Sequence, residues 1–142
     1  MRSRRGIKWV VWSLFFVCLG QALYIYMSAP GRPNPVKITS VTNVGHGGAI
    51  YEVLYDSGGA TVPLVYRYFL MNLQPGDEEA LQKAKKTAPF LVTKSSAAVR
   101  EVLDDRVKLK VDGVIYEFHN MSLFKVDGEI NVVKFDLDST AP

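Results

Sequence analysis

The sequence predicts a β-rich α+β domain that follows a single N-terminal transmembrane helix. Three observations lead to this prediction: an uninterrupted apolar segment near the N-terminus, strand-like patterns over most of residues 36–138, and one helix-like stretch among them. We expect an antiparallel sheet of about seven or eight strands with one inserted helix. The expected boundaries are a cytoplasmic basic tail at 1–6, the transmembrane helix at 7–27, a proline-rich stalk at 28–35, an extracytoplasmic domain at 36–138 and a tail at 139–142.

The positive charge of the chain is concentrated at its N-terminus. The sequence has 17 Lys and Arg, 14 Asp and Glu, and a formal net charge of +3 at pH 7. Four basic residues lie in the first eight positions, so the net charge of the residues after position 8 is −1. A nucleic-acid surface needs Lys and Arg gathered on the domain itself. The charge distribution therefore argues against a nucleic-acid partner.

The apolar segment 7–27 has the length and the flanking residues of a span through the lipid bilayer. A helix of that length rises about 31 Å, which matches a hydrocarbon core of ~30 Å. Aromatic residues stand near both ends, as in interfacial belts: Trp9, Trp12, Tyr24 and Tyr26. Because the basic residues precede the span, we expect the N-terminus in the cytoplasm and the domain in the periplasm or outside, beyond the cytoplasmic (inner) membrane.

A cleaved signal peptide is the alternative interpretation of this segment. Gly20-Gln21-Ala22 has the small-x-small form of a cleavage site. The length of the apolar run and the aromatic residues on both sides of that site favour an uncleaved anchor. Phe15-Phe16-Val17 before Cys18 is too bulky for a lipoprotein cleavage box. Cys18 is the only cysteine, which excludes an intramolecular disulfide and a cysteine-cluster metal site.

The first half of the domain should consist of strands joined by glycine-rich connections. Residues 28–35 (SAPGRPNP) hold three prolines and a glycine, which end the helix and predict a short, stiff stalk. Three strand-like runs follow, at 36–41, 49–55 and 62–71. We expect a loop at 43–48 and a hairpin connection at 56–61.

One helix is expected inside the domain, from Asp77 to about Thr87. Acidic residues fill its first turn, lysines lie toward its C-terminal end, and Pro89 enforces its end. Its apolar stripe should comprise Leu81, Ala84 and Ala88 and should pack on a sheet.

The last third of the chain predicts a meander of two hairpins. Residues 107–111 alternate and then reach Asp112-Gly113, and Asp127-Gly128 recurs fifteen residues later. Aspartate-glycine suits a type I′ turn, because both positions need a positive φ. Residues 97–103 have both helix-favouring and strand-favouring side chains, and the adjacent Asp104-Asp105 turn favours a strand.

No residue pattern in the chain has the spacing of a catalytic or metal site. Gly45-His46-Gly47-Gly48 is similar to an oxyanion loop, but no G-x-S-x-G elbow accompanies it. The segment that begins at Ser57 lacks the Lys-Ser/Thr ending of a phosphate-binding loop. The two histidines, His46 and His119, have no partner at metal-ligand spacing. We therefore expect no enzyme activity, no metal and no cofactor; an enzyme built on His46, Ser57 or His119 is the disfavoured alternative.

Residues 51–70 (YEVLYDSGGATVPLVYRYFL), followed by the strand 103–111, resemble a pattern in small bacterial membrane-anchored or lipoprotein domains of unknown function. Gly59-Ala60-Thr61 matches the turn between two strands in that pattern. The cysteine that often precedes the turn is Gly58 here, and the tryptophan before the acidic turn is Leu103 or a neighbour. The resemblance implies a bacterial envelope protein and supplies no catalytic residues.

The hypothesis that follows is a non-enzymatic binding or assembly module with a partner protein in the envelope. Tyrosine-rich patches make good interface anchors, and the candidate surface is Tyr51, Tyr55, Tyr66, Tyr68 and Phe69. Alternation along the strands means that about half of these should face the core. A specific form of the hypothesis is an immunity protein against a periplasmic toxin. The alternative is a structural subunit of an envelope complex, packed through its transmembrane helix.

Overall fold

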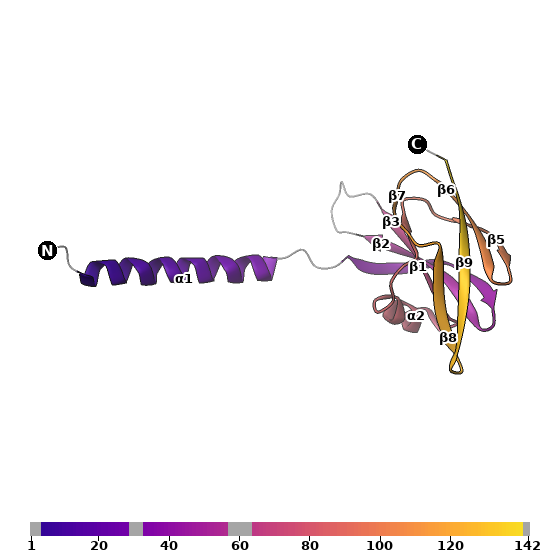
Figure 1. Cartoon of the computed structure of the whole chain (residues 1–142), viewed down its shortest axis with the longest axis horizontal. Coiled ribbons are helices and arrows are strands. Elements are labelled where there is room, and N and C mark those ends of the chain that lie inside the picture. Colours follow the sequence, from indigo (N-terminus) through magenta and orange to yellow (C-terminus); the bar gives the residue numbers. More distant parts are fainter. Residues whose placement is uncertain (1–3, 29–32, 57–63, 141–142) are drawn as a thin grey trace. The chain divides into compact units, whose positions relative to one another are not determined.

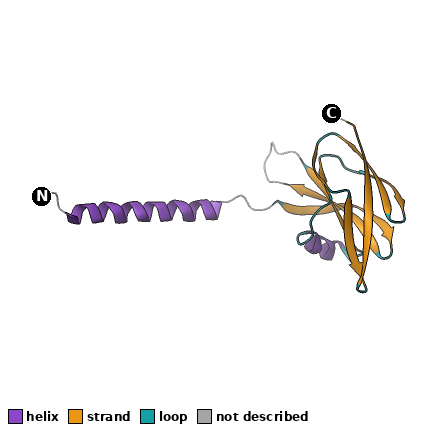
Figure 2. Cartoon of the chain, in the orientation of Figure 1, coloured by secondary structure: helices purple, strands orange, loops and turns teal. Residues whose placement is uncertain are grey.

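The computed structural model describes residues 4–28, 33–56 and 64–140, which form one long helix and one β-rich domain (Figures 1 and 2). The chain divides into two compact units, Met1–Arg32 and Pro33–Pro142. The predicted stalk at 28–35 lies partly outside the described residues, and a strand already begins within it, at Asn34.

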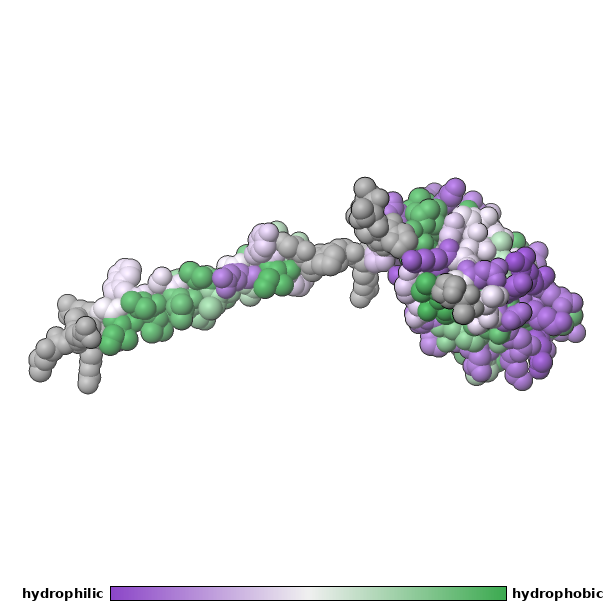
Figure 3. Space-filling model, turned by 90° about the horizontal axis from the view of Figure 1, so that it is seen from above, coloured by the Kyte–Doolittle hydropathy of each residue, from purple (hydrophilic) through white to green (hydrophobic). Residues whose placement is uncertain are grey.

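Helix α1 (Arg4–Ser28) is long and apolar enough to cross a membrane. Its candidate span, Gly6–Met27, has 22 residues and is not buried inside the structure. Figure 3 shows apolar surface along the helix. The sequence prediction of a helix over 7–27 is therefore confirmed.

The described part of the domain contains nine strands, which form two sheets, and one helix. The elements are β1 (Asn34–Gly45), β2 (Gly48–Asp56), β3 (Val65–Asn72), α2 (Asp77–Ala84), β4 (Leu91–Thr93), β5 (Val99–Leu103), β6 (Arg106–Asp112), β7 (Ile115–Phe118), β8 (Met121–Val126) and β9 (Glu129–Thr140). Sheet A has the strand order β1-β2-β3-β4-β7, and sheet B has the order β5-β6-β9-β8. Neighbouring strands pair antiparallel except β6 and β9, which are parallel. The β-rich α+β class is confirmed, with two sheets where we expected one.

The main core lies between the two sheets. The alternating sequence of strand β6 explains why one of its faces enters this core. Val107, Leu109 and Val111 are buried, while Lys108 and Lys110, on the alternate positions, are exposed. The core cluster also contains Val44, Ile50, Tyr68, Leu70, Phe90, Leu91, Ala98, Phe124, Val133 and Phe135. The rings of Phe90 and Phe135 stack at 3.8 Å between centroids, with 5° between their planes. This contact joins the segment before β4 of sheet A to β9 of sheet B.

Helix α2 packs against a second buried cluster, on the other side of β2 and β3. Ala80 and Ala84 are buried there, and Leu81 is partly buried. The helix begins at Asp77 as predicted but ends at Ala84 instead of Thr87. Ala88, which we expected in its apolar stripe, therefore lies beyond the helix and is exposed.

Only one of the two predicted aspartate-glycine hairpins forms. Asp127 and Gly128 have φ values of 51° and 86°, and they join the antiparallel strands β8 and β9. At Asp112-Gly113 the prediction was wrong, because β6 belongs to sheet B while β7 pairs with β4 in sheet A. Two hydrogen bonds stabilise the passage of the chain from sheet B to sheet A. The hydroxyl of Ser95 donates to the carbonyl of Asp112 at 2.5 Å, and the hydroxyl of Thr93 donates to the carbonyl of Val114 at 2.8 Å. The prediction of a strand in 97–103 is confirmed as β5.

Gly48, at the start of β2, allows the sheets to approach closely. A Cβ built on Gly48 would lie 2.3 Å from the ring of Phe124, which projects from β8 into the core. Contacts of that length do not occur between real atoms, so any larger residue must displace the ring. The spacing of β2 and β8 therefore depends on a residue without a side chain.

We expect Gly48→Ala to lower the free energy of unfolding by about 1–3 kcal/mol, because it overpacks the core beside Phe124. Urea titration of the detergent-solubilised chain, followed by the proteolytic susceptibility of the domain, measures the change. Gly76→Ala is the matched control, since its Cβ would meet only the mobile carboxylate end of Glu79, at 2.6 Å. Equal losses in the two variants would contradict this account of Gly48.

Candidate functional site

Four of the five aromatic residues predicted to form a binding surface lie inside the domain. The exposed fractions are 2% for Tyr51, 4% for Tyr55, 0% for Tyr68 and 1% for Phe69, and Tyr66 is half-buried. Side chains alternate between the two faces of β2 and β3, but neither face is exposed. One face packs on sheet B, and the other contributes to the cluster with α2. The prediction of a surface on these residues was therefore wrong.

The buried tyrosines have structural hydrogen bonds. The hydroxyl of Tyr51 accepts the backbone N–H of Gln74 at 2.8 Å. The hydroxyl of Tyr68 donates to the carbonyl of Ser95 at 3.0 Å and accepts the N–H of Ala98 at 3.1 Å. Burial raises the pKa of Tyr68 above its ordinary value of 10, and nearby Glu52 adds to this increase. Tyr68 is therefore neutral across the physiological range.

Glu52 is the one charged residue buried in the described part of the domain, with 5% of its surface exposed. One carboxylate oxygen accepts the hydroxyl of Thr39 at 2.7 Å, and the other accepts the N–H of Ala97 at 2.8 Å. Ala97 has a φ of 53°, a conformation that costs a non-glycine residue free energy. The carboxylate therefore joins β1, β2 and the strained turn before β5, and both of its oxygens are used in doing so. Sequence reasoning missed this residue, although an acidic residue in the middle of an apolar strand was a visible signal.

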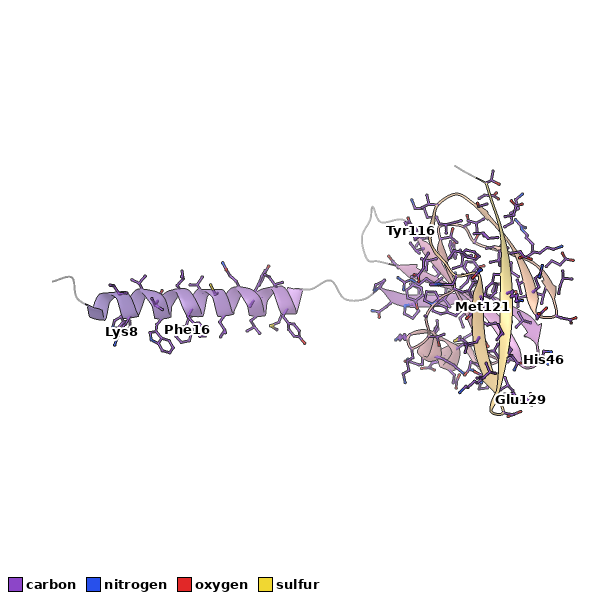
Figure 4. The ribbon with its side chains drawn as sticks, in the orientation of Figure 1. Lys8, Phe16, His46, Tyr116, Met121 and Glu129 are labelled. Atoms are coloured by element: carbon purple, nitrogen blue, oxygen red, sulfur yellow. The ribbon has the colours of Figure 1, made fainter. Side chains whose placement is uncertain are left out.

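The loop residues considered for chemistry are turn or surface residues. His46 and Gly47 have φ values of 50° and 76° and form a tight turn between β1 and β2, where His46 is exposed (Figure 4). The loop expected at 43–48 is therefore a two-residue hairpin turn, and residues 43–45 belong to β1. His119 is exposed and its Nε2 lies 2.9 Å from the carboxylate of Glu117. Ser57 lies outside the described residues. Within the described ranges, no group of three or more His, Cys, Asp or Glu side chains could hold a metal ion.

Exposed apolar side chains gather on the outer face of the β8–β9 hairpin. Leu123 of β8 is directly opposite Val132 of β9, and Met121 and Ile130 flank this pair. Their exposed fractions are 56% for Met121, 58% for Leu123, 59% for Ile130 and 42% for Val132. In Figure 4, Met121 marks the start of β8, and Glu129 lies at the tip of the hairpin. We call these four residues the β8–β9 patch.

The rest of the outer face of sheet B is mostly charged. Strand β6 exposes Arg106, Lys108 and Lys110, and ion pairs cross to its neighbours: Lys108 to Glu101 at 2.7 Å and Arg106 to Asp136 at 3.4 Å. Lys134 is opposite Met121 and Lys125 is opposite Ile130, so lysines border the patch at both ends. One sheet face is therefore divided into a charged half and an apolar half. A contiguous apolar patch with a polar rim is typical of a protein-binding surface.

The sequence contained a signal for this patch. Strand β6 alternates between apolar and charged residues, whereas β8 reads MSLFKV and has apolar side chains on both of its faces. A strand at the edge of a sheet with a solvent-exposed outer face needs apolar residues on one side only. The additional apolar residues are Met121 and Leu123.

Helix α1 has a shallow hollow on one side of its apolar surface. Val17, Gly20, Gln21, Tyr24 and Ile25 line it. Residues 17, 20, 21 and 24 share one helix face by their spacing. Gly20 has no side chain there, and a Cβ at this position would meet nothing within 4 Å. The four aromatic residues predicted for the membrane interfaces are exposed on the helix: Trp9, Trp12, Tyr24 and Tyr26.

Comparison with protein-family models, with curated proteins and with solved structures finds no match to this chain. The functional argument therefore depends on the geometry of two surfaces. The first is the β8–β9 patch of the domain, and the second is the apolar helix α1.

Proposed function

We propose that the chain is a non-enzymatic binding or assembly module of a bacterial envelope. In this proposal α1 anchors it in the inner membrane, and the domain in the periplasm binds a partner protein through the β8–β9 patch. The observation that supports it is the division of one sheet face into a charged half and an exposed apolar half. The favourable part of the binding free energy would come from burying the apolar half.

The composition of the patch fits a protein partner. Methionine is enriched at interface cores and adapts to the shape of the opposing surface. Met121 lies in the patch on β8, beside the directly opposed pair Leu123 and Val132. Lysines at the rim, where water remains, would steer association more than they would add affinity. An apolar centre with a basic rim therefore favours a partner with an apolar, acid-rimmed surface.

An immunity protein against a periplasmic toxin is the specific form of this proposal. A membrane-tethered domain that binds one toxin and needs no catalytic group has the features described above. Gene neighbourhood is the simplest discriminator, since a toxin gene beside this one favours protection, and secretion or envelope genes favour assembly. Loss of protection in cells that carry a patch variant would be the direct result expected of an immunity protein.

We expect Leu123→Asp to reduce the recovery of the partner at least tenfold when the tagged full-length chain is isolated from gently solubilised native membranes. A carboxylate at the centre of the patch must be desolvated in the complex, which opposes binding. Leu103→Asp is the matched control, because Leu103 is 44% exposed but lies on β5, at the other edge of sheet B. A stoichiometric partner that is retained by Leu123→Asp and lost from Leu103→Asp would contradict the assignment of the patch.

A structural subunit that packs through α1 is the second candidate function. The hollow at Gly20 supports it, because glycine allows a second helix to approach closely. Gln21 lines the same hollow, and its side-chain amide within an apolar span would gain a hydrogen bond from a neighbouring helix. Both residues lie on the face of α1 that also carries Val17 and Tyr24.

Replacing residues 7–27 with an unrelated transmembrane segment separates the two functions. A module that binds through the β8–β9 patch should retain its partner, because the new segment still holds the domain at the membrane. A subunit that packs through α1 should lose its partners, and Gln21→Leu alone should weaken the assembly by about 0.6–2 kcal/mol. The measurement is the yield of co-purified protein at equal expression.

A further inference from the structure

Strand β8 has a free backbone edge. In sheet B it pairs only with β9, so its other side has no strand neighbour in the described part of the chain. The N–H of Phe135 donates to the carbonyl of Asn120 at 2.8 Å, which sets the phase of the antiparallel ladder. By alternation, Ser122, Phe124 and Val126 bond to β9, while the backbone groups of Met121, Leu123 and Lys125 point away from it.

A groove runs along this free edge. One hollow of about 210 Å³ is lined by β8, the end of β3 and residues beside α2: Leu123, Phe124, Lys125, Leu70, Met71, Asn72, Lys83 and Thr87. A second, of about 230 Å³, lies between Met121 and Ser122 on one side and Ala88, Pro89 and Phe90 on the other. The two hollows follow each other along the same pair of segments, β8 and residues 83–90. In Figure 1, α2 and β9 lie on opposite sides of β8.

The far wall of the groove does not extend sheet B. It consists of the end of β3, the end of α2 and the segment that leads to β4, which includes Pro89. Proline has no N–H to donate, a helix presents no strand edge, and β3 is paired within sheet A. The five residues 121–125 extend over about 17 Å, enough to pair with one short strand.

The charges of the groove favour an acidic occupant. The lining residues include Lys83 and Lys125 and no carboxylate. His119 also lines the groove, but its ring is paired with Glu117, so the positive charge depends on the lysines. Lys85 and Lys86, which follow α2, are exposed next to Lys83. An extended segment with carboxylates on the side of these lysines is complementary to the groove.

We propose that an extended acidic segment of the partner protein adds to sheet B as a strand beside β8. Its backbone pairs with Met121, Leu123 and Lys125, its carboxylates lie near Lys83 and Lys125, and its apolar residues continue the β8–β9 patch. This inference rests on the proposed function and specifies how the partner binds. Strand addition at a free sheet edge is a common form of peptide recognition, in which backbone hydrogen bonds supply affinity and side chains supply specificity.

The probe for the test is a labelled ten-residue peptide in which valine alternates with glutamate, measured by fluorescence anisotropy with the full-length chain in nanodiscs. We expect it to bind at least tenfold more tightly than the same peptide with lysine in place of glutamate. The double variant Lys83→Glu/Lys125→Glu should reverse this preference. The control variant Arg100→Glu/Lys110→Glu changes the same charge on β5 and β6 and should leave the preference unchanged.

A second variant tests the backbone pairing. In Met121→Pro, the lost N–H is one that points to the free edge, so the β8–β9 bonds remain, and the first position of a strand tolerates proline. Met121→Ala is the control for the lost side chain. We expect Met121→Pro to weaken binding of the probe at least fivefold more than Met121→Ala does. Equal affinities in these two variants would overturn strand addition.

The remaining outcomes separate this inference from the proposed function. Equal affinity for the two peptides, or binding of neither, would overturn the inference. If native partner recovery depended on Leu123 but not on the two lysines, the inference would fail and the proposed function would stand. If recovery depended on none of these residues, both would fail. In a Cys18→Ser background, a disulfide between two copies of Leu123→Cys would identify the occupant as a second copy and would also overturn the inference.

Discussion

Phe135→Ala is expected to lower the free energy of unfolding by about 3–5 kcal/mol, the usual cost of removing a buried phenyl ring. Phe135 is 3% exposed, and its ring stacks on Phe90 at 3.8 Å. The two rings come from different parts of the chain, one before β4 and one in the middle of β9. Their contact therefore holds sheet A against sheet B, and its loss leaves a cavity that the rigid strands cannot close.

Urea titration of the detergent-solubilised full chain, with protease susceptibility of the domain as the signal, measures this loss. Val132→Ala is the control on the same strand, because Val132 points outward and is 42% exposed. We expect the control to change the free energy of unfolding by less than about 0.5 kcal/mol. If Phe135→Ala were no more destabilising than Val132→Ala, the packing of the two sheets described above would be wrong.

Glu52→Ala is expected to lower the free energy of unfolding by about 3 kcal/mol, because it removes two charge-assisted hydrogen bonds of a buried carboxylate. The N–H of Ala97 loses its acceptor, and the hydroxyl of Thr39 keeps only the backbone carbonyl of residue 52, at 3.2 Å. Ala97 would also lose the contact that holds its positive φ of 53°. Urea titration of the detergent-solubilised full chain measures the loss in the free energy of unfolding.

Glu101→Ala is the matched control for Glu52→Ala. Its carboxylate also has a partner at 2.7 Å, the amino group of Lys108, but both side chains are about half exposed. Exposed ion pairs contribute about 0–1 kcal/mol, so the control should be nearly neutral. Glu52→Gln should give an intermediate loss, since one amide oxygen can replace only one of the two acceptors. Similar values for Glu52→Ala and Glu101→Ala would contradict a structural role for Glu52.

Elements with local signals could be predicted from the sequence. Helix α1 follows from its apolar length, and the start of α2 follows from the acidic residues after Gly76. The alternation of β6 and the Asp127-Gly128 turn predict a strand and a hairpin, because each depends on neighbouring residues alone. The glycines around His46 similarly permit positive φ values in a two-residue turn, although we expected a looser loop there.

The assignment of strands to sheets could not be predicted, because it depends on contacts between distant residues. Asp112-Gly113 has the composition of a hairpin turn, yet hydrogen bonds from Thr93 and Ser95 direct the chain across to sheet A. The wrong prediction of an exposed tyrosine surface has the same cause. Period-two alternation predicts one exposed face, and only the packing of both α2 and sheet B on β2 and β3 shows that neither face is free.

Photo-crosslinking in native membranes tests the central claim, partner binding through the β8–β9 patch, most directly. A photoreactive amino acid is placed at position 123 of the full-length chain and, as the control, at position 103, and adducts are identified by mass spectrometry. The account predicts one predominant protein adduct from position 123 and none from position 103. An adduct from position 103 alone, or no adduct from position 123 in membranes where the chain functions, would contradict it.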